Sequence, residues 1–349
     1  MRRMGLGLAG TVLAAILSGC CLVTEKTPPP VRLAWGATDN AAETIKVCRE
    51  TGFTKLAVGQ GQLPAILKAA NGQGVEVYYW DSNTLPADAG TNFFRQQMSE
   101  AENTAYFTLK TAKVPDPGQY QFGGEPLAGH RDVLSCELLC FHHQEVVAYR
   151  KTEIKKALRQ HPGVAGVAFD FYGYQNYHCC HCQHSVRLFE QTLASGKYAG
   201  LSREKAWEQF SLDTLVAFYN EMAAYVRSLD PNLKTAAHVY PVFQAEPLYG
   251  NRLDIDYCAQ TVAWFFPPYW GEDKIVRYTR EVVNDATRYY PRQAGIPFIG
   301  MYVTCKPVDV FRRELKIIRA NSNGSLSLCG FHDVVQDKAY QQTIIEEMK

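Results

Sequence analysis

Strands and helices alternate along almost the whole of this 349-residue chain, and this alternation constrains its fold more than any other feature. Nearly continuous apolar runs bounded by turn residues are expected to be strands buried on both faces. They are residues 31–37, 55–58, 75–80, 164–171, 234–240, 255–263, 297–303 and 325–331. Helical periodicity predicts helices between them. These are residues 41–50, 63–70, 145–160, 202–229, 273–288, 308–320 and 338–348.

Eight strand–helix units over about 320 residues fit a (β/α)8 TIM barrel of the α/β class. The third unit is followed by a large insertion, about residues 81–140, with a short helix expected near 93–103 and a Pro/Gly-rich stretch at 115–129. A doubly wound open sheet is the alternative, but no glycine-rich phosphate-binding turn follows the first strand. The glycines at 59 and 61 are too few for that fingerprint. We therefore expect one barrel domain over residues 31–349.

The amino terminus has the three parts of an export signal. Arg2 and Arg3 precede an apolar run at residues 4–17, which is too short to span a membrane comfortably. The run ends in Leu-Ser-Gly-Cys at residues 17–20, which resembles the lipobox of bacterial lipoproteins. That resemblance implies that residues 1–19 are removed and that Cys20 is acylated. The alternative is an ordinary signal peptide cleaved near a cysteine.

The residue after Cys20 is Cys21 rather than Asp, which in lipoproteins of Gram-negative bacteria implies delivery to the outer membrane. Residues 20–30, with three consecutive prolines at 28–30, are expected to form a stiff tether between the lipid and the domain. The resemblance thus predicts a partner, the membrane, contacted through the lipid.

Composition excludes some classes of ligand. The chain has 36 Lys+Arg against 35 Asp+Glu, so no overall positive field favours nucleic acid. Its 20 Tyr, 17 Phe and 5 Trp suit a neutral, ring-shaped ligand such as a sugar better than a polyanion, although aromatic residues also fill cores. Carbohydrate is the expected partner, and no cofactor is expected.

The active site of a TIM barrel lies at the carboxyl ends of its strands. In this chain those ends are aromatic, hydrogen-bonding and acidic, with no Ser-His-Asp elbow, Walker loop or His-Glu-x-x-His motif. The residues expected there are Trp35, Trp80, Asp81, Asp170, His238, Tyr240, Gln260, Thr261, Tyr302, Thr304, His332 and Asp333.

The fourth predicted strand has the most specific pattern. An apolar run from residue 163 ends in Asp170, an aromatic residue follows, and cysteines stand at 179, 180 and 182. The segment 142–149 precedes it as the start of a helix. Residues 142–189 resemble glycoside-hydrolase-like barrels, whose fourth strand often has this form. Family 18 chitinases place a Glu two residues after the matching Asp, where this chain has Tyr172, so the resemblance does not extend to their substrate-assisted mechanism.

Glycosidic cleavage ordinarily needs two carboxyl groups. Asp170 is the candidate nucleophile or base, and Glu246 after strand five or Asp333 after strand eight is the candidate partner. Glu137, Asp81 and Glu272 are interpreted as solvated loop charges. Alternatively Asp170 only caps a loop or holds substrate hydroxyls, and the chain is a non-catalytic glycan-binding lipoprotein.

Aromatic and polar side chains near these ends are candidate sugar contacts, because flat rings stack on sugar C–H faces. The densest cluster is at residues 264–270, and its alternative role is to pack onto the barrel rim. The candidates are Trp35, Trp80, Tyr172, Tyr174, His238, Gln260, Trp264, Tyr302 and His332.

Eleven cysteines are many for one domain, and exported proteins meet an oxidising environment. At least one disulfide is expected within the group Cys136, Cys140, Cys179, Cys180 and Cys182, because these residues fall in two loops that flank strand four. A zinc site using Cys179 and Cys182 with His184 or Cys140 is the competing interpretation. Cys258, Cys305 and Cys329 are expected to be buried thiols.

Overall fold

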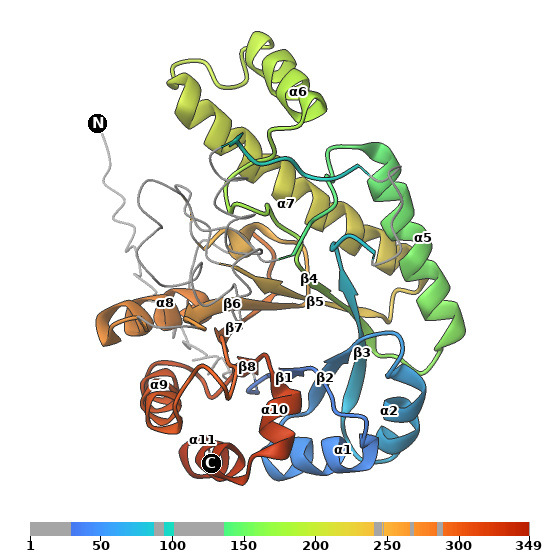
Figure 1. Cartoon of the computed structure of the whole chain (residues 1–349), viewed down its shortest axis with the longest axis vertical. Coiled ribbons are helices and arrows are strands. Elements are labelled where there is room, and N and C mark those ends of the chain that lie inside the picture. The colour runs from blue at the N-terminus through green and yellow to red at the C-terminus, as the bar shows by residue number, and fades with distance from the viewer. Residues whose placement is uncertain are drawn as a thin grey trace, which may run out of the picture.

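The computed structural model describes residues 29–86, 94–100, 136–240, 246, 248–265, 269–284 and 289–348. Eight parallel strands close into a barrel in chain order, so the expected TIM barrel is confirmed (Figure 1). The strands are β1 (Arg32–Trp35), β2 (Lys55–Val58), β3 (Glu76–Ser82), β4 (Gly166–Asp170), β5 (Lys234–Val239), β6 (Tyr257–Ala263), β7 (Ala294–Ile299) and β8 (Leu326–Leu328).

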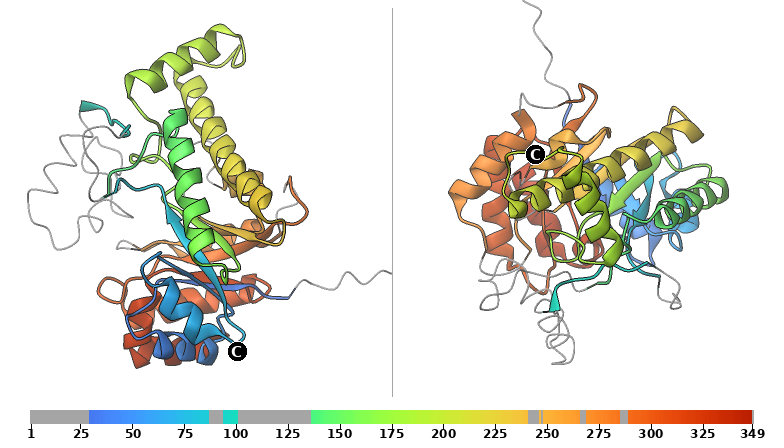
Figure 2. Two further views of the ribbon diagram at one scale, coloured as in Figure 1. Left: turned by 90° about the vertical axis from the view of Figure 1, so that its right-hand side faces the viewer. Right: turned by 90° about the horizontal axis from the view of Figure 1, so that it is seen from above.

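Helices cover the outside of the barrel (Figures 1 and 2). They are α1 (Ala41–Glu50), α2 (Leu63–Ala70), α5 (Gln144–Gln160), α6 (Gln183–Ala194), α7 (Arg203–Leu229), the 3-10 helix η1 (Tyr249–Arg252), α8 (Glu272–Asn284), α9 (Val308–Asn321), α10 (Phe331–Gln336) and α11 (Lys338–Met348). Local capping sets several of their first turns. The side chains of Asn40 and Ser202 accept backbone N–H groups at the start of α1 and α7.

The observed elements differ from the expected ones in four places. The helix α6 was not among the predicted helices, and only Ser185 and Phe189 are buried on it. The last predicted strand ends at Leu328, and Phe331 begins α10 instead. Strand β7 begins and ends earlier than residues 297–303. Of the helix expected near 93–103, residues 94–99 are extended or irregular, Glu100 is helical, and the remainder lies outside the described residues.

The strand register brings the ends of β3 and β4 together. Ser82 lies beside Asp170, and the backbone N–H of Asn83 donates to the carbonyl of Asp170 at 3.2 Å. The chain therefore leaves β3 at the carboxyl end of β4, where the candidate acid lies. At the start of β4, the strand approaches β5 so closely that a Cβ at Gly166 would overlap the carbonyl oxygen of Lys234.

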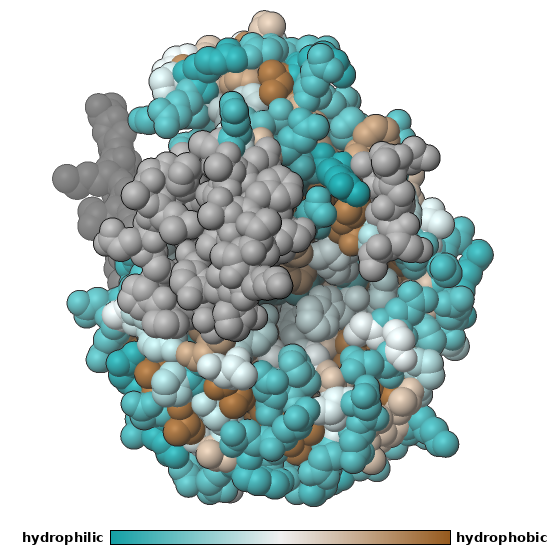
Figure 3. All heavy atoms as spheres, viewed as in Figure 1, coloured by the Kyte–Doolittle hydropathy of each residue, from teal (hydrophilic) through white to brown (hydrophobic). Residues whose placement is uncertain are grey.

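The helices α6 and α7 extend beyond the barrel (Figure 2). A separate small core of Phe189, Tyr198, Ala206 and Phe210 holds this hairpin together. The face seen in Figure 3 is mostly hydrophilic, with hydrophobic side chains in small scattered groups. Among the helices that the structure describes, none combines the length and apolarity needed to cross a bilayer.

Candidate active site at the carboxyl end of the barrel

Asp170 is the last residue of β4, and its side chain is almost fully buried inside the barrel. Its Oδ1 accepts the N–H of Phe171 at 2.8 Å and lies 3.0 Å from Nδ1 of His238, at the corresponding level of β5. The other ring nitrogen of His238, Nε2, lies 3.1 Å from the hydroxyl of Thr261 on β6. A polar chain thus crosses three neighbouring strands.

Thr261 holds the far side of the His238 ring. Its hydroxyl lies 3.1 Å from Nε2 of His238 and 3.2 Å from the carbonyl oxygen of Val239. Since a hydroxyl both donates and accepts, Thr261 can serve either tautomer of His238. In the tautomer with a hydrogen on Nδ1, the imidazole donates to the carboxylate of Asp170. The structure thus places a carboxylate and an imidazole in direct contact inside the barrel.

Two indoles lie next to this pair. Trp35 from β1 packs edge-on against Trp80 from β3, with ring centroids 5.7 Å apart, and lies 6.2 Å from the ring of His238. The Nε1–H of Trp35 donates to the Ser327 hydroxyl at 2.9 Å, which fixes the ring. The structure brings together four predicted site residues from different strands, namely Trp35, Trp80, Asp170 and His238.

A second aromatic group continues from His238 toward the barrel rim. The ring of His238 stacks on Phe298 at 3.7 Å and lies 4.1 Å from Tyr240. Phe265 bridges Phe298 and Tyr302, with centroids 6.0 and 5.8 Å away. Burial, followed by the charge of Asp170, raises the pKa of Tyr240 well above its ordinary value. Tyr302 contacts Phe265, and Phe265 contacts His238, so Tyr302 belongs to the aromatic group next to the Asp170–His238 pair.

The backbone next to Asp170 is strained. Phe171 has a φ of 54°, in the left-handed region that bulky residues rarely adopt. Such strain costs on the order of 1–3 kcal/mol and is found more often at functional sites than elsewhere. Tyr177, in the loop that follows, has a φ of 55°.

The two candidate partner carboxylates do not contact Asp170 directly in any described interaction. Glu246 forms an ion pair with Arg252 at 3.4 Å, and Arg252 also pairs with Asp213 of α7. Asp333 follows β8, where its Oδ2 accepts the N–H of Val303 at 3.3 Å. Since β8 and β4 are four strands apart in the closed barrel, Asp333 and Asp170 lie on opposite sides of the mouth.

His332 lies near the end of β1. Its side chain is 45% exposed and lies 3.3 Å from the carboxylate of Asp333. The ring packs so close to Gly36 that a Cβ there would be 3.0 Å from Nδ1. His332 and Asp333 thus form a polar pair at the rim, on the side of β1 and β8.

Tyr172 and Tyr174 use their hydroxyls inside the protein. Tyr172 is completely buried and donates to Asp81 at 2.5 Å, and Asp81 also forms an ion pair with Arg150 of α5. Tyr174 donates to the carbonyl of Ser211 at 3.0 Å. Both rings lie between the strands and the helix layer, and their role in sugar binding stays a prediction.

Gln260 and Trp264 also point away from Asp170. Oε1 of Gln260 accepts the N–H of Gly250 at 3.1 Å, so this side chain faces η1. Trp264 stacks on Trp270 at 5.5 Å. Thr261, the next residue on β6, reaches His238 instead, because successive side chains along a strand point to opposite faces. Phe265, after the end of β6, also lies against the ring of His238.

The loop cysteines form no disulfide. None of the nine cysteines that the structure describes is part of a disulfide, and Sγ of Cys140 and Sγ of Cys182 are 3.7 Å apart. A disulfide needs about 2.05 Å, so the disulfide expectation is wrong for this structure. Cys258 and Cys329 are buried, as expected, and Cys305 is partly exposed.

No protein-family model and no curated protein matches this sequence. Solved structures of glycoside hydrolases do match the fold. A β-galactosidase from Halorubrum lacusprofundi has a TM-score of 0.57 at 11% identity, covering 91% of this chain and 57% of its own. An α-L-fucosidase from Paenibacillus thiaminolyticus has a TM-score of 0.54 at 13% identity, covering 91% and 49%. A β-galactosidase from Rahnella sp. R3 has 0.51 at 13%, covering 93% and 56%.

The chain therefore shares the TIM-barrel fold of these proteins. It spans only about half the length of these three proteins. At identities this low the comparisons establish only the shared fold, so the activity must be argued from the site.

Proposed function

We propose that the protein is a glycoside hydrolase that acts on an extracellular or periplasmic glycan. The observation that supports this most directly is the 3.0 Å contact between the carboxylate of Asp170 and the imidazole of His238, beside the indoles of Trp35 and Trp80. Stacking on Trp80, which is partly exposed and backed by the buried Trp35, would orient a sugar ring. The Asp170–His238 pair would handle the proton that glycosidic cleavage must move. The fold shared with β-galactosidases and a fucosidase supports a carbohydrate ligand.

In this proposal Asp170 is the nucleophile or base, and Asp333 is the preferred partner. Glu246 is already paired with a cation, Arg252, whereas Asp333 lies in the first turn of α10, directly after β8, and has no Lys or Arg partner among the described ion pairs. A partner on the opposite side of the mouth leaves space for a water molecule between the carboxyl groups. Inverting enzymes have this arrangement, with separations of about 6.5–9.5 Å. We therefore propose inversion of the anomeric centre.

A glycan-binding protein without catalysis is the second candidate. It is favoured by the hydrogen bond from Val303 to Asp333, which is a structural use of that carboxylate. In this alternative Asp170 and His238 hold sugar hydroxyls and no bond is broken.

The two candidates are separated by one pair of measurements on the Asp170→Asn variant. Hydrolysis of a glycan panel should fall by at least about 10²–10⁴-fold, the usual contribution of a general acid or base, while binding measured by calorimetry largely survives. Asp333→Asn should show the same pattern, and Glu246→Gln should keep its turnover. Undiminished turnover of Asp170→Asn would rule out Asp170 as nucleophile or base, and binding without turnover in the wild type would favour the second candidate.

We also propose that the protein is anchored by lipid on Cys20, in the outer membrane. The charged start, the apolar run and the lipobox-like residues 17–20 support this proposal. A Cys20→Ser variant should lose both membrane fractionation and labelling by a fatty-acid probe. Unchanged labelling of that variant would refute the anchor.

A further inference from the structure

Three cysteine sulfurs from two loops meet beside the barrel mouth. Cys140 precedes α5, and Cys180 and Cys182 lie in the loop between β4 and α6. Their Sγ atoms all lie within 4.8 Å of one another, and all three side chains are buried. Buried polarisable sulfurs in such a group are typical ligands of a soft or borderline metal ion.

The spacing of the sulfurs fits a tetrahedral metal site. A Zn–S bond is about 2.3 Å, so two sulfurs on one tetrahedral zinc ion are about 3.8 Å apart. The distance between Cys140 and Cys182 is 3.7 Å. This distance matches the tetrahedral edge and is far too long for a covalent S–S bond.

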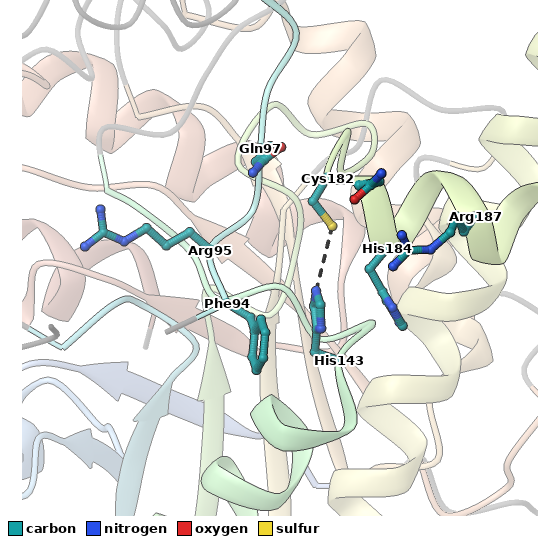
Figure 4. Close-up of a pocket in the computed structure, with 8 residues that line it drawn as sticks. Phe94, Arg95, Gln97, His143, Cys182, His184 and Arg187 are labelled. Carbon is teal, nitrogen blue, oxygen red and sulfur yellow. Dashed lines mark hydrogen bonds between the residues drawn. The ribbon is translucent and has the colours of Figure 1, made fainter. Parts of the chain in front are cut away.

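A histidine lies next to Cys182, outside the group of three sulfurs that lie within 4.8 Å of one another. Nε2 of His143 lies 3.9 Å from Sγ of Cys182 and points toward it from the start of α5 (Figure 4). The same tetrahedral geometry, with Zn–N about 2.0–2.1 Å, requires about 3.6 Å. The ring of His143 is held on both faces, stacking on Phe94 at 4.1 Å and on His184 at 4.2 Å.

His184 is not available to a metal through its Nε2. This nitrogen lies 3.0 Å from the carbonyl oxygen of His142, which can only accept, so it carries a hydrogen. Cys179 lies outside the group of three, and its sulfur is 3.2 Å from Nε2 of His181. The ligand set thus differs from one built on Cys179 and His184.

Backbone N–H groups are positioned to stabilise thiolates. Sγ of Cys180 accepts from the N–H groups of Gln97 at 3.4 Å and Cys182 at 3.5 Å. Sγ of Cys182 accepts from the N–H of Ser185 at 3.4 Å, in the first turn of α6, where the helix dipole also favours a negative charge. Metal ligation requires the cysteines as thiolates, and these donors offset part of their charge.

We propose that Cys140, Cys180, Cys182 and His143 bind one structural zinc ion. Three thiolates and one imidazole fill a tetrahedral site and leave no position open for a substrate. The ion would join the segment before α5 to the loop after β4. The segment at residues 94–97 is held beside them by the bond from Gln97 to Cys180 and by a 2.7 Å bond from the N–H of His181 to the carbonyl of Gln97. The metal would thereby fix the loop that begins at Asp170.

The wild-type protein provides the first test. The full chain, purified in detergent under reducing conditions, should contain about one zinc ion. X-ray absorption should give about three sulfurs at 2.3 Å and one nitrogen near 2.0 Å. Cobalt added after zinc removal should give the intense visible bands of tetrahedral thiolate coordination. A first shell without sulfur, or a metal-free protein with a Cys140–Cys182 disulfide, would overturn the proposal.

Variants then test the ligand assignment. Cys180→Ser and His143→Gln should each weaken zinc binding by more than about 10–100-fold, the usual loss for an outer-shell partner. Cys179→Ser is the matched control and should retain its zinc. Retention of zinc by Cys180→Ser together with loss by Cys179→Ser would refute this ligand set. If a variant does not fold, the wild-type absorption spectrum still decides between the assigned shell and another. None of these measurements depends on glycan hydrolysis.

Discussion

Replacing Arg150 by Met should destabilise the barrel strongly, because it leaves a carboxylate buried without a cation. Arg150 of α5 and Asp81 of β3 form an ion pair in which the side chains are 6% and 0% exposed. Breaking such a pair from one side costs about 3–5 kcal/mol. For a domain of this size roughly 2 °C of melting temperature corresponds to each kcal/mol. We therefore expect a melting temperature lower by about 6–10 °C.

Lys151 supplies a matched control on the same helix. It pairs with Glu221 at 2.6 Å, but the two side chains are 30% and 43% exposed. Exposed pairs contribute about 0–1 kcal/mol, so Lys151→Met should change the melting temperature by about 2 °C or less. The double variant Arg150→Met/Asp81→Leu should recover much of the loss, because two apolar side chains replace the pair without a stranded charge.

The assay is thermal unfolding followed by circular dichroism, with urea titrations to obtain the free energy of unfolding. Tyr172→Phe belongs in the same series. Its hydroxyl donates to Asp81, and a hydrogen bond to a charged group is worth about 1.5–3 kcal/mol. Equal losses for Arg150→Met and Lys151→Met would refute the reasoning. A Tyr172→Phe variant with native stability but weakened glycan binding would instead support the sugar contact expected from the sequence.

Two further predictions concern the barrel and its pH dependence. Gly166→Ala should prevent stable folding, since its Cβ would overlap the backbone of β5. Gly173→Ala is the control and should fold normally, because there is open space around that position. Soluble yield and unfolding curves of the two variants provide the comparison. Burial opposes ionisation of Asp213, but hydrogen bonds from Lys197 and its neighbours outweigh it and lower the pKa of Asp213. Its stabilisation is therefore present above pH 3.8 and is lost as the pH falls through the folded-state pKa. Urea titrations should show the stability difference between wild type and Asp213→Asn shrinking below that pH, and a constant difference would contradict the sign.

The barrel and the residues at the centre of its mouth could be predicted from the sequence. Strand–helix alternation indicated a closed parallel sheet, and position at a strand end placed Trp35, Trp80, Asp170 and His238 near one another. These inferences succeed because a parallel strand buried on both faces is visible as a continuous apolar run, and because all its neighbours end at the same rim.

The same burial hides which way each side chain points. A strand that is apolar on both faces shows no alternation of polarity, so Gln260 and Thr261 were equal candidates by sequence. The tertiary structure resolves them, since η1 provides partners for Gln260 on the outside while His238 meets Thr261 inside. The interpretation of Asp81 as a solvated loop charge was wrong. Its side chain lies on β3 and is completely buried, where Arg150 of α5 neutralises it.

The cysteine group is the clearest case of a feature that only tertiary structure decides. Sequence separated Cys140 from Cys182 by a helix and a strand, and it left Cys179 and Cys180 indistinguishable. The closed barrel brings the segment before α5 against the loop after β4, because β3 and β4 are neighbours and their connections leave at one rim. Residue types and strand order come from the sequence alone, whereas the distance between two sulfurs from different loops depends on how the helices pack around the barrel.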